Sequence, residues 1–418
     1  MAQAQAKNDV IPQWAADEIK TKANAGLVSE AALREEFQIV RHRMVAFLNV
    51  WGRQMDNGAE QYLHFGATTV DIYDTLLVLQ ILSAVDQFIV AQRAIEERLI
   101  MMSDKYQSTP MVGRTLGQHA LPITFGKKVS GWLGENRRHI ERLKSIRIEL
   151  RQSAILKGAV GSYLGLGEQA IAVERDFAAF LGLDEPYSDD WHGSRDILAQ
   201  YALTLALVSK SYGRWGQEVF LMQSTDLAEV LEQRPATAVS SSSMPHKNNP
   251  SRSEALMHHG RTIPRLAEVL LDDVVNFYER DNTSRPNRTA AQLTIAAASM
   301  LRDTQTLLNR LQINEAKMRE NLDRTDGMLT SQRLVMALAP AMGKQVANDH
   351  IHRLAKQAYA GELRFAEVLI QDPEVSKHLD AQQIRDLTDP STYLGLDAAL
   401  VQNVIRDVRA ARKTDPVK

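Results

Sequence analysis

Long stretches of the chain are apolar at helical spacing and contain neither proline nor glycine. The longest runs from Tyr73 to Thr109, and within it LLVLQILSAV (76–85) is apolar on nearly every side. Because proline breaks a helix and glycine weakens one, this stretch predicts a helix of about 30 residues, against the usual 11 or 12. A helix that is apolar nearly all round must be buried on more than one side.

Further apolar stretches at helical spacing span about 125–156, 196–233, 251–280 and 289–311, and the first three tolerate a few interruptions by glycine or proline. No strand-like alternation of any length competes with them. The pattern predicts an all-α fold, with a central bundle of long helices at 111–340 between smaller helical domains at 1–110 and 341–418. The surplus of apolar positions also predicts that the bundle packs against other subunits.

The composition excludes several classes of function. The net charge is −2, so the chain has no electrostatic footprint for nucleic acid or an acidic membrane. It has no cysteine, and its histidines lack metal-ligand spacing, so we expect no metal and no other cofactor. No uninterrupted apolar run approaches the roughly 20 residues that span a bilayer, and MAQAQAKNDVIPQW lacks the apolar core of a secretory signal. We therefore expect a soluble, cytoplasmic protein.

Polar chemistry concentrates in three segments at the ends of the long helices. They are HFGATTVD (64–71), GRTLGQH (113–119) and SSSSMPHKNNP (240–250). Taken singly, each is an ordinary loop, turn or helix cap, as Thr68 and Asp71 would be at the start of a helix. Together they would place hydroxyls, amides, an arginine and a lysine at helix ends, which favours the binding of carboxylates.

These segments resemble the conserved regions of the fumarase/aspartase superfamily. SSSSMPHKNNPSRSE is similar to the signature loop, G-S-S-x-M-P-x-K-x-N-P followed by a glutamate, which here is Glu254. HFGATTVDIYDT resembles the first conserved region, and MVGRTLGQHALPITFGKK resembles the second, usually G-R-T-H. The closest branches are adenylosuccinate lyase, to which VRHRMVAFLNVWG around His42 is similar, and 3-carboxy-cis,cis-muconate cycloisomerase. Further similar segments are KGAVGSYLG (157–165), DWHGSRD (190–196), FYERD (277–281) and ENLDRTDGMLTSQRL (320–334).

The resemblance implies a homotetramer whose active sites are shared between subunits, and the anti-elimination of fumarate from a succinyl group. Removing a proton next to a carboxylate requires donors that stabilise the second negative charge on that carboxylate. By resemblance, Ser241 is the base, helped by loop amides and by the charge of Lys247. The residues that the resemblance places around the substrate are Thr68, Thr69, Thr115, Gln118, Arg195, Ser242, Met244, Asn249 and Arg288.

Four departures from the family pattern bear on the substrate. The histidine of G-R-T-H is Leu116, which leaves His42 or His119 as the acid, unless these are structural histidines. The glycine before the catalytic serines is Ser240, and Arg43 replaces an aspartate beside His42. The segment DVIPQWAADEIKTKANAGLV (9–28) has two lysines and no arginine, so the R-Y-S-R element that grips a nucleotide phosphate has no counterpart.

These departures favour a small, doubly anionic substrate over a nucleotide. We predict a carbon–nitrogen lyase that cleaves a small, iminodisuccinate-like N-substituted aspartate or succinate into fumarate and an amine or amino acid. The alternatives are adenylosuccinate lyase, a muconate-type cycloisomerase and a catalytically inactive helical scaffold. The scaffold is favoured by Leu116 and Ser240 and opposed by Ser241, Lys247 and Asn249. The sequence determines neither the leaving group nor the stereochemistry.

Overall fold

The computed structural model describes residues 1–235, 237, 241–281, 283, 286–361 and 363–416. Its contacts divide the chain into two compact units, and the chain passes between them several times. Unit 1 comprises Met1–Ile89, Glu141–Leu207 and Thr262–Ala298. Unit 2 comprises Val90–Ile140, Val208–Arg261 and Ser299–Lys418. The sequence predicts three domains that follow one another along the chain, whereas each of these units is built from three separate segments. The three-domain division stays a prediction.

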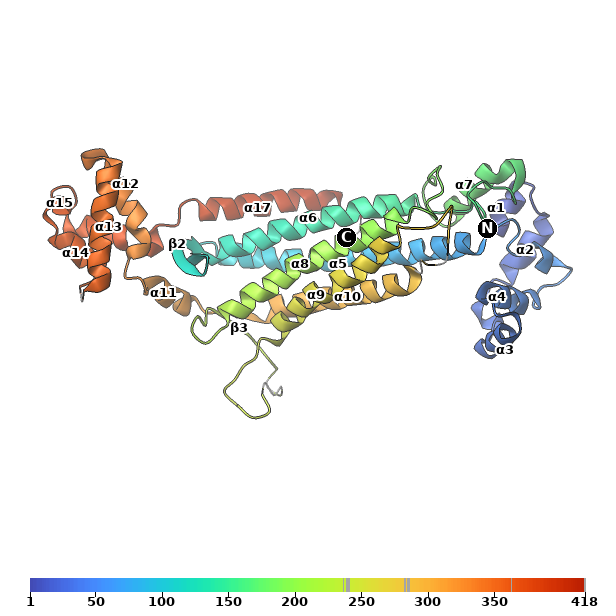
Figure 1. Cartoon of the computed structure of the whole chain (residues 1–418), viewed down its shortest axis with the longest axis horizontal. Coiled ribbons are helices and arrows are strands. Elements are labelled where there is room, and N and C mark those ends of the chain that lie inside the picture. Colours follow the sequence, from blue (N-terminus) through green and yellow to red (C-terminus); the bar gives the residue numbers. More distant parts are fainter. Residues whose placement is uncertain (236, 238–240, 282, 284–285, 362, 417–418) are drawn as a thin grey trace. The chain divides into compact units, whose positions relative to one another are not determined.

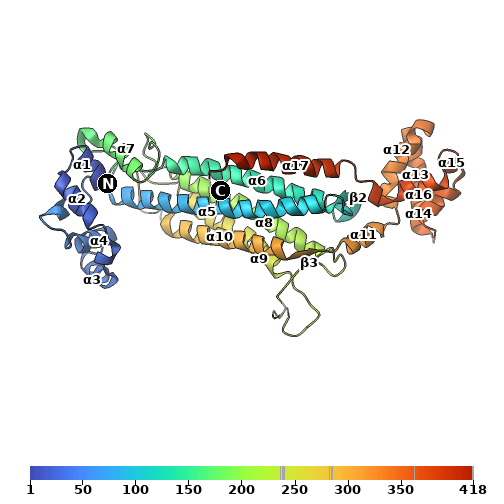
Figure 2. The ribbon, with the colours of Figure 1, turned by 180° about the vertical axis from the view of Figure 1, so that it is seen from behind.

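The all-α prediction is confirmed, and five long helices contribute residues to both units (Figures 1 and 2). They are α5 (Thr69–Lys105), α6 (Phe125–Arg151), α8 (Asp196–Met222), α9 (Ser251–Asp272) and α10 (Pro286–Arg310). Each begins close to its predicted start. The predicted ends of two are wrong: α8 stops at Met222 because residues 230–232 form a strand, and α9 stops at Asp272 rather than near Arg280.

Helix α5 is long and apolar enough, by length and composition alone, to cross a membrane. In unit 1 its side chains at Leu77, Ile81, Val85 and Ile89 are buried, and this spacing of about four residues places them on one face. Burial of such a face is typical of the core helix of a globular protein.

The remaining helices are short. In unit 1 they are α1 (Ala2–Lys7), α2 (Gln13–Thr21), α3 (Glu30–Val40), α4 (Arg43–Gly52) and α7 (Ala170–Phe180). In unit 2 they are α11 (Glu315–Asp323), α12 (Ser331–Met342), α13 (Lys344–Ala360), α14 (Phe365–Gln371), α15 (Pro373–Ser376), α16 (Ala381–Thr388) and α17 (Asp397–Ala411). Helices α12 to α16 enclose an apolar cluster around Leu338, Ile351 and Phe365.

Two glycines inside α8 have a packing function. A Cβ atom on Gly213 would lie 3.2 Å from the Cα atom of Gly260 in α9. A Cβ atom on Gly216 would lie 2.8 Å from both the Cβ atom of Leu256 and the carbonyl oxygen of Ser253. These glycines therefore let the unit 2 parts of α8 and α9 approach closely, which offsets the cost of glycine in a helix.

Two short antiparallel strand pairs in unit 2 were not predicted. Strands β1 (Pro110–Thr115) and β2 (Gln118–Thr124) pair with each other, and β3 (Val230–Glu232) pairs with β4 (Leu311–Ile313). The turn between β1 and β2 consists of Leu116 and Gly117, both with positive φ, at 52° and 76°. A tight two-residue hairpin turn of this type requires positive φ at both central residues. An Asn-Gly pair predicts such a turn, whereas Leu-Gly does not.

Candidate active site

The first conserved segment begins α5 in unit 1. The backbone N–H of Thr68 donates to Oδ2 of Asp71 at 2.8 Å, as at the start of many helices. Within the part of the chain that the structure describes, the hydroxyls of Thr68 and Thr69 have no hydrogen-bond partner, and both side chains are partly exposed. They are therefore available to donate to a carboxylate, as the sequence predicts, and that function stays a prediction.

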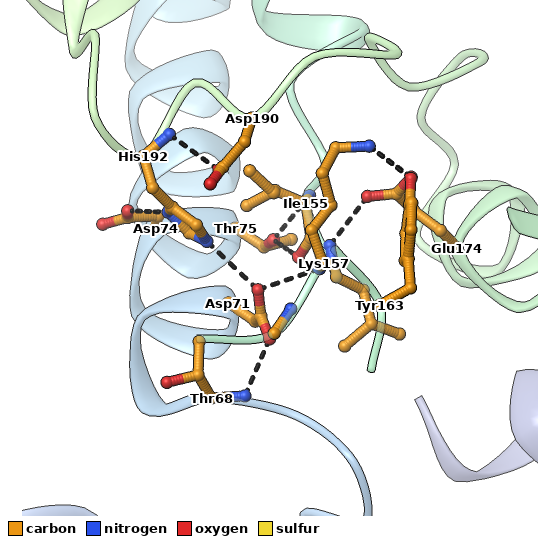
Figure 3. Close-up of polar contacts among 12 residues, drawn as sticks. Thr68, Asp71, Asp74, Thr75, Ile155, Lys157, Tyr163, Glu174, Asp190 and His192 are labelled. Atoms are coloured by element: carbon orange, nitrogen blue, oxygen red, sulfur yellow. Dashed lines mark hydrogen bonds and ion pairs between the residues drawn. The ribbon is translucent and has the colours of Figure 1, made fainter. Parts of the chain in front are cut away.

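Asp71 is fully buried and holds three segments of unit 1 together. Besides the Thr68 amide, its carboxylate accepts from the backbone N–H groups of Lys157 at 3.1 Å and Gly158 at 3.2 Å. It also bonds His192 Nε2 at 3.1 Å. The first conserved segment is thus fixed to KGAVGSYLG and DWHGSRD by one carboxylate (Figure 3).

His192 lies between two carboxylates and is itself buried (Figure 3). Its Nδ1 is 2.7 Å from Asp74 Oδ2, while its Nε2 faces Asp71. A carboxylate only accepts, so the imidazolium, which donates from both nitrogens, suits this position best. Burial by itself lowers the pKa of His192, but the hydrogen bonds to Asp71 and Asp74 outweigh it and raise the pKa above its ordinary value.

A second buried charged group fixes the KGAVGSYLG segment (Figure 3). Glu174 of α7 accepts from Lys157 Nζ at 2.9 Å, from Tyr163 Oη at 2.6 Å and from the Leu156 amide at 2.9 Å. Nearby, Gly66 approaches Gly165 so closely that a Cβ atom on Gly66 would lie 2.4 Å from the carbonyl oxygen of Gly165. The loop before Thr68 therefore rests on a rigid support.

Arg195, which the sequence predicts to bind an anionic group of the substrate, is 3% exposed. Its Nη1 donates to Asp74 within the same buried cluster, and its backbone has a positive φ of 56°. The structure therefore places Arg195 where it positions Asp74 and His192. Arg288, predicted for a similar function, is exposed in the first turn of α10.

Two histidines lie near the start of this region. His42 is exposed at the N-terminus of α4, where its Nδ1 accepts from the Val45 amide at 3.3 Å. Since Nδ1 accepts, Nε2 carries the proton in the neutral ring and could donate it. His64 was not among the predicted site residues, although it opens HFGATTVD. It is half-buried, its Nε2 is buried without a partner among the described residues, and burial lowers its pKa.

The second conserved segment lies in unit 2 and forms the tip of the β1–β2 hairpin. Arg114 donates to both oxygens of the buried Glu229, at 3.0 and 2.7 Å. Thr115 and Gln118 flank the turn and are exposed, and Leu116, at the position of the family histidine, is 99% exposed. Burial first, and then the charge of Arg114, lower the pKa of His119, which favours its neutral form.

The signature loop also lies in unit 2. Oγ of Ser241 accepts from the backbone N–H of Met244 at 3.0 Å and from that of Ser243 at 3.4 Å. Two amide donors on this oxygen favour its alkoxide over its alcohol. Ser240 lies outside the described residues, so the effect of its replacing glycine stays a prediction. Ser242, Met244 and Lys247 are exposed.

The loop is anchored where it joins α9. Gln223 donates to the carbonyl oxygen of Asn248 at 3.0 Å, and Arg234 donates to that of Asn249. The carboxylate of Glu232 accepts from the amides of Arg252 and Ser253, each at 2.9 Å, and so caps α9. Glu254, the family glutamate, is exposed in the first turn of α9.

The predicted site residues fall into two sets. Unit 1 holds His42, Thr68, Thr69, Arg195 and Arg288, and unit 2 holds Thr115, Gln118, Ser241, Ser242, Met244, Lys247 and Asn249. Among the residues that the structure describes, no group of three or more acidic or histidine side chains has the arrangement of a metal site.

Comparison with known proteins identifies the family. A model of the family described as "Lyase" matches residues 2–264, and one described as "Adenylosuccinate lyase C-terminus" matches residues 327–404. The chain belongs to the fumarase/aspartase superfamily.

Members of this superfamily with different activities resemble the chain about equally. Adenylosuccinate lyase of Methanocaldococcus jannaschii is 31% identical over 98% of this chain and 89% of its own length. N-acetyl-S-(2-succino)cysteine lyase of Dickeya dadantii is 32% identical over 97% of this chain and 89% of its own. The crystal structure of 3-carboxy-cis,cis-muconate lactonizing enzyme from Pseudomonas putida is 30% identical, covers 98% of this chain and 92% of that one, and has a TM-score of 0.89.

Proposed function

We propose that this superfamily member is a carbon–nitrogen lyase that releases fumarate from a small N-substituted aspartate or succinate. The observation that carries the proposal is the environment of Ser241, whose oxygen accepts from two loop amides. In the proposed reaction, Oγ of Ser241 removes the proton next to a carboxylate. The electron pair passes through that carboxylate and expels nitrogen from the neighbouring carbon, which forms the double bond of fumarate. The second charge on the carboxylate is stabilised by Lys247 and Asn249, an effect often worth several kcal/mol.

The other carboxylate of the substrate is assigned to the hydroxyls of Thr68, Thr69 and Thr115. Gln118, Ser242 and Met244 line the same site. Arg288 adds positive charge, whereas the buried Arg195 acts through Asp74 and His192. A departing alkylamine is basic enough to take a proton from water or from Nε2 of His42, so a leaving group of this kind tolerates Leu116 in place of the family histidine. No metal or other cofactor enters this scheme.

The N-terminal segment supports a small substrate rather than a nucleotide. It has no arginine, and Lys22 is already paired with Asp56 at 3.2 Å and with Glu18 at 3.8 Å. In this segment a nucleotide phosphate would meet Lys20, a single exposed lysine, in place of the arginines of the family's R-Y-S-R element. The Dickeya dadantii relative, by its name, acts on a small succinyl thioether, so a carbon–sulfur substrate is the second candidate.

We further propose a homotetramer in which each active site draws residues from several subunits. The long helices expose large apolar side chains, among them Leu76, Leu203, Leu221 and Ile295. Contacts between subunits would remove these from water, at about 25 cal/mol per Å² of apolar surface. Light scattering coupled to gel filtration measures this directly, and a monomer at micromolar concentration would contradict it. A cytoplasmic location is part of the same proposal.

The test is an ultraviolet assay of fumarate formation and consumption. The protein is incubated with fumarate and a panel of amines and amino acids, and separately with N-acetyl-S-(2-succino)cysteine, adenylosuccinate and 3-carboxymuconate. Ser241→Ala should abolish turnover, whereas Ser243→Ala, an exposed serine of the same loop, should leave most of it. Amine addition supports the proposal. Turnover of adenylosuccinate alone contradicts it, cycloisomerisation alone reassigns the activity, and inactivity throughout favours a scaffold.

A further inference from the structure

A cavity of about 250 Å³ lies in unit 2 at the foot of the signature loop. Its walls are the segment after β3, the first two residues of α9 and the last turn of α10. Three arginines line it: Arg234, Arg252 and Arg310. One water occupies about 30 Å³ of liquid, so the cavity has room for a small polyatomic ion and several waters.

The pairing of β3 with β4 brings together the two chain segments that carry Arg234 and Arg310. In its register Glu232 pairs with Leu311, and the pairing continues as the Gln233 amide donates to the Arg310 carbonyl oxygen at 2.9 Å. Arg234 therefore follows directly after the residue that pairs with Arg310. Two cations that line one cavity repel each other, and an anion bound between them relieves that repulsion.

The acidic groups around the cavity are committed to other donors. Asp303 pairs with Arg252 at 2.8 Å. The carboxylate of Glu232 is occupied by the Arg252 and Ser253 amides and by the Ser253 hydroxyl, which donates at 2.6 Å. Neither Arg234 nor Arg310 has an ion-pair partner among the residues that the structure describes. Within the same described residues, Nε of Arg234 is in addition buried without a hydrogen-bond partner.

We propose that this cavity binds a small oxyanion of the phosphate or sulfate type between Arg234 and Arg310. A guanidinium presents parallel N–H groups that match two oxygens of such an ion, and charge-assisted bonds of this kind are the strong ones. The buried Nε of Arg234 would then gain an acceptor. No residue assigned to the chemistry lines this cavity.

The site also bears on the signature loop. Arg234 donates to the carbonyl oxygen of Asn249, the residue proposed to bind the substrate carboxylate. An anion bound to the same guanidinium would change the strength of the hydrogen bond from Arg234 to Asn249, and so the attachment of the end of the loop. We therefore expect phosphate to alter KM for the substrate. This consequence, unlike the binding itself, rests on the proposed function.

The binding is tested by titrating the full-length protein with inorganic phosphate in a calorimeter, free of sulfate. Arg310→Gln, at an exposed position, should weaken binding about tenfold. The matched control is Arg409→Gln, because Arg409 of α17 lines another cationic hollow, together with Arg406 of the same helix and Lys413 of the turn that follows it. Its affinity should equal that of the wild type. Thermal unfolding verifies that both variants are folded.

The possible outcomes distinguish specific binding of phosphate in this cavity from nonspecific attraction of phosphate to positively charged surface. Absence of saturable binding to the wild type overturns the proposal, and so does equal binding by Arg310→Gln. Ser241→Ala should bind phosphate as the wild type does, whereas loss of binding there would place the ion at the catalytic loop and overturn it as well. Because calorimetry needs no turnover, failure of the proposed function leaves this result interpretable.

Discussion

The first conserved segment in unit 1 and the signature loop in unit 2 are built in opposite ways. Around Asp71 the charged side chains of Asp71, Asp74, His192 and Arg195 are buried and form one cluster that joins three segments. Along residues 242–247 the side chains are exposed, and the loop is anchored beyond them, at Asn248 and Asn249.

The contrast separates two tasks. A buried, hydrogen-bonded cluster holds Thr68 and Thr69 in place before any substrate arrives, and preorganised donors cost no reorganisation at the moment of reaction. The exposed loop carries Ser241, the proposed base, and Lys247, and in the proposed reaction it would close over the substrate to exclude water from them. Substitutions in the loop should therefore lower activity and leave the free energy of unfolding nearly unchanged. Substitutions in the cluster should mainly lower the free energy of unfolding.

The largest effect is expected from Ser241→Ala. Loss of the base should lower kcat by roughly 10²- to 10⁴-fold, because no neighbouring group takes over the proton. The free energy of unfolding should stay within about 0.5 kcal/mol of the wild type, since the hydroxyl bonds only two amides of an exposed loop. Fumarate absorbance and urea denaturation measure the two quantities. A large loss of stability would show that the loop is part of the fold.

Asp71→Asn should have the opposite profile. It removes a buried charge from His192 and weakens the bonds from three amides, so we expect a loss of about 3 to 5 kcal/mol in the free energy of unfolding. The control is Asp86→Asn on the same helix, where a half-exposed pair with Arg147 at 2.6 Å should contribute under about 1 kcal/mol. Equal losses in the two variants would contradict a special role for the cluster.

Gly66→Ala tests the support beneath the threonines. Both Gly66 and Gly167 have positive φ, at 69° and 71°, so alanine is strained equally at each. At Gly167 the new Cβ atom meets nothing within 4 Å, whereas at Gly66 it would lie 2.4 Å from a carbonyl oxygen. Urea denaturation should show Gly66→Ala to be less stable than Gly167→Ala by about 1 to 3 kcal/mol. Equal stability would mean that the backbone at Gly165 can move away from the new Cβ atom without a loss in the free energy of unfolding.

The pH dependence of stability isolates His192. Its pKa is raised in the folded state, so its stabilising contribution is complete below about pH 6.5 and is lost as pH rises through the folded-state value. His192→Gln should remove this part of the slope. Glu96, whose pKa burial raises to about 7, adds a slope common to both proteins. Urea denaturation at a series of pH values gives the difference. Parallel curves for the two proteins would show that His192 is neutral when buried.

The smallest effect is expected from Leu116→His, which restores the family histidine. The side chain is exposed, and histidine tolerates positive φ better than leucine, so stability should change by less than about 0.5 kcal/mol. If the leaving group is a basic amine, kcat should hardly change either. A large rise in kcat would instead show that the leaving group needs an acid at this position. Steady-state assays with the substrate found above distinguish the two cases.

Much of the fold follows from the sequence because helix formation is local. Apolar runs at helical spacing predicted the five long helices and nearly all their starts. Their ends were less certain, because α8 gives way at Met222 to a strand that forms only through pairing with residues 311–313, far along the chain. The β1–β2 hairpin was missed for a similar reason: its turn uses Leu116 in a strained conformation that the residue type does not announce.

The sequence by itself determined the superfamily, since ordered motifs survive without knowledge of their contacts, and it named the loop that carries Ser241 and Lys247. Only the tertiary structure decided what each charged group touches. It placed Arg195 against Asp74, gave His192 two carboxylates and gathered Arg234, Arg252 and Arg310 around one cavity. Those outcomes depend on burial and on partners far apart in the chain, and neither is written in the spacing of residues.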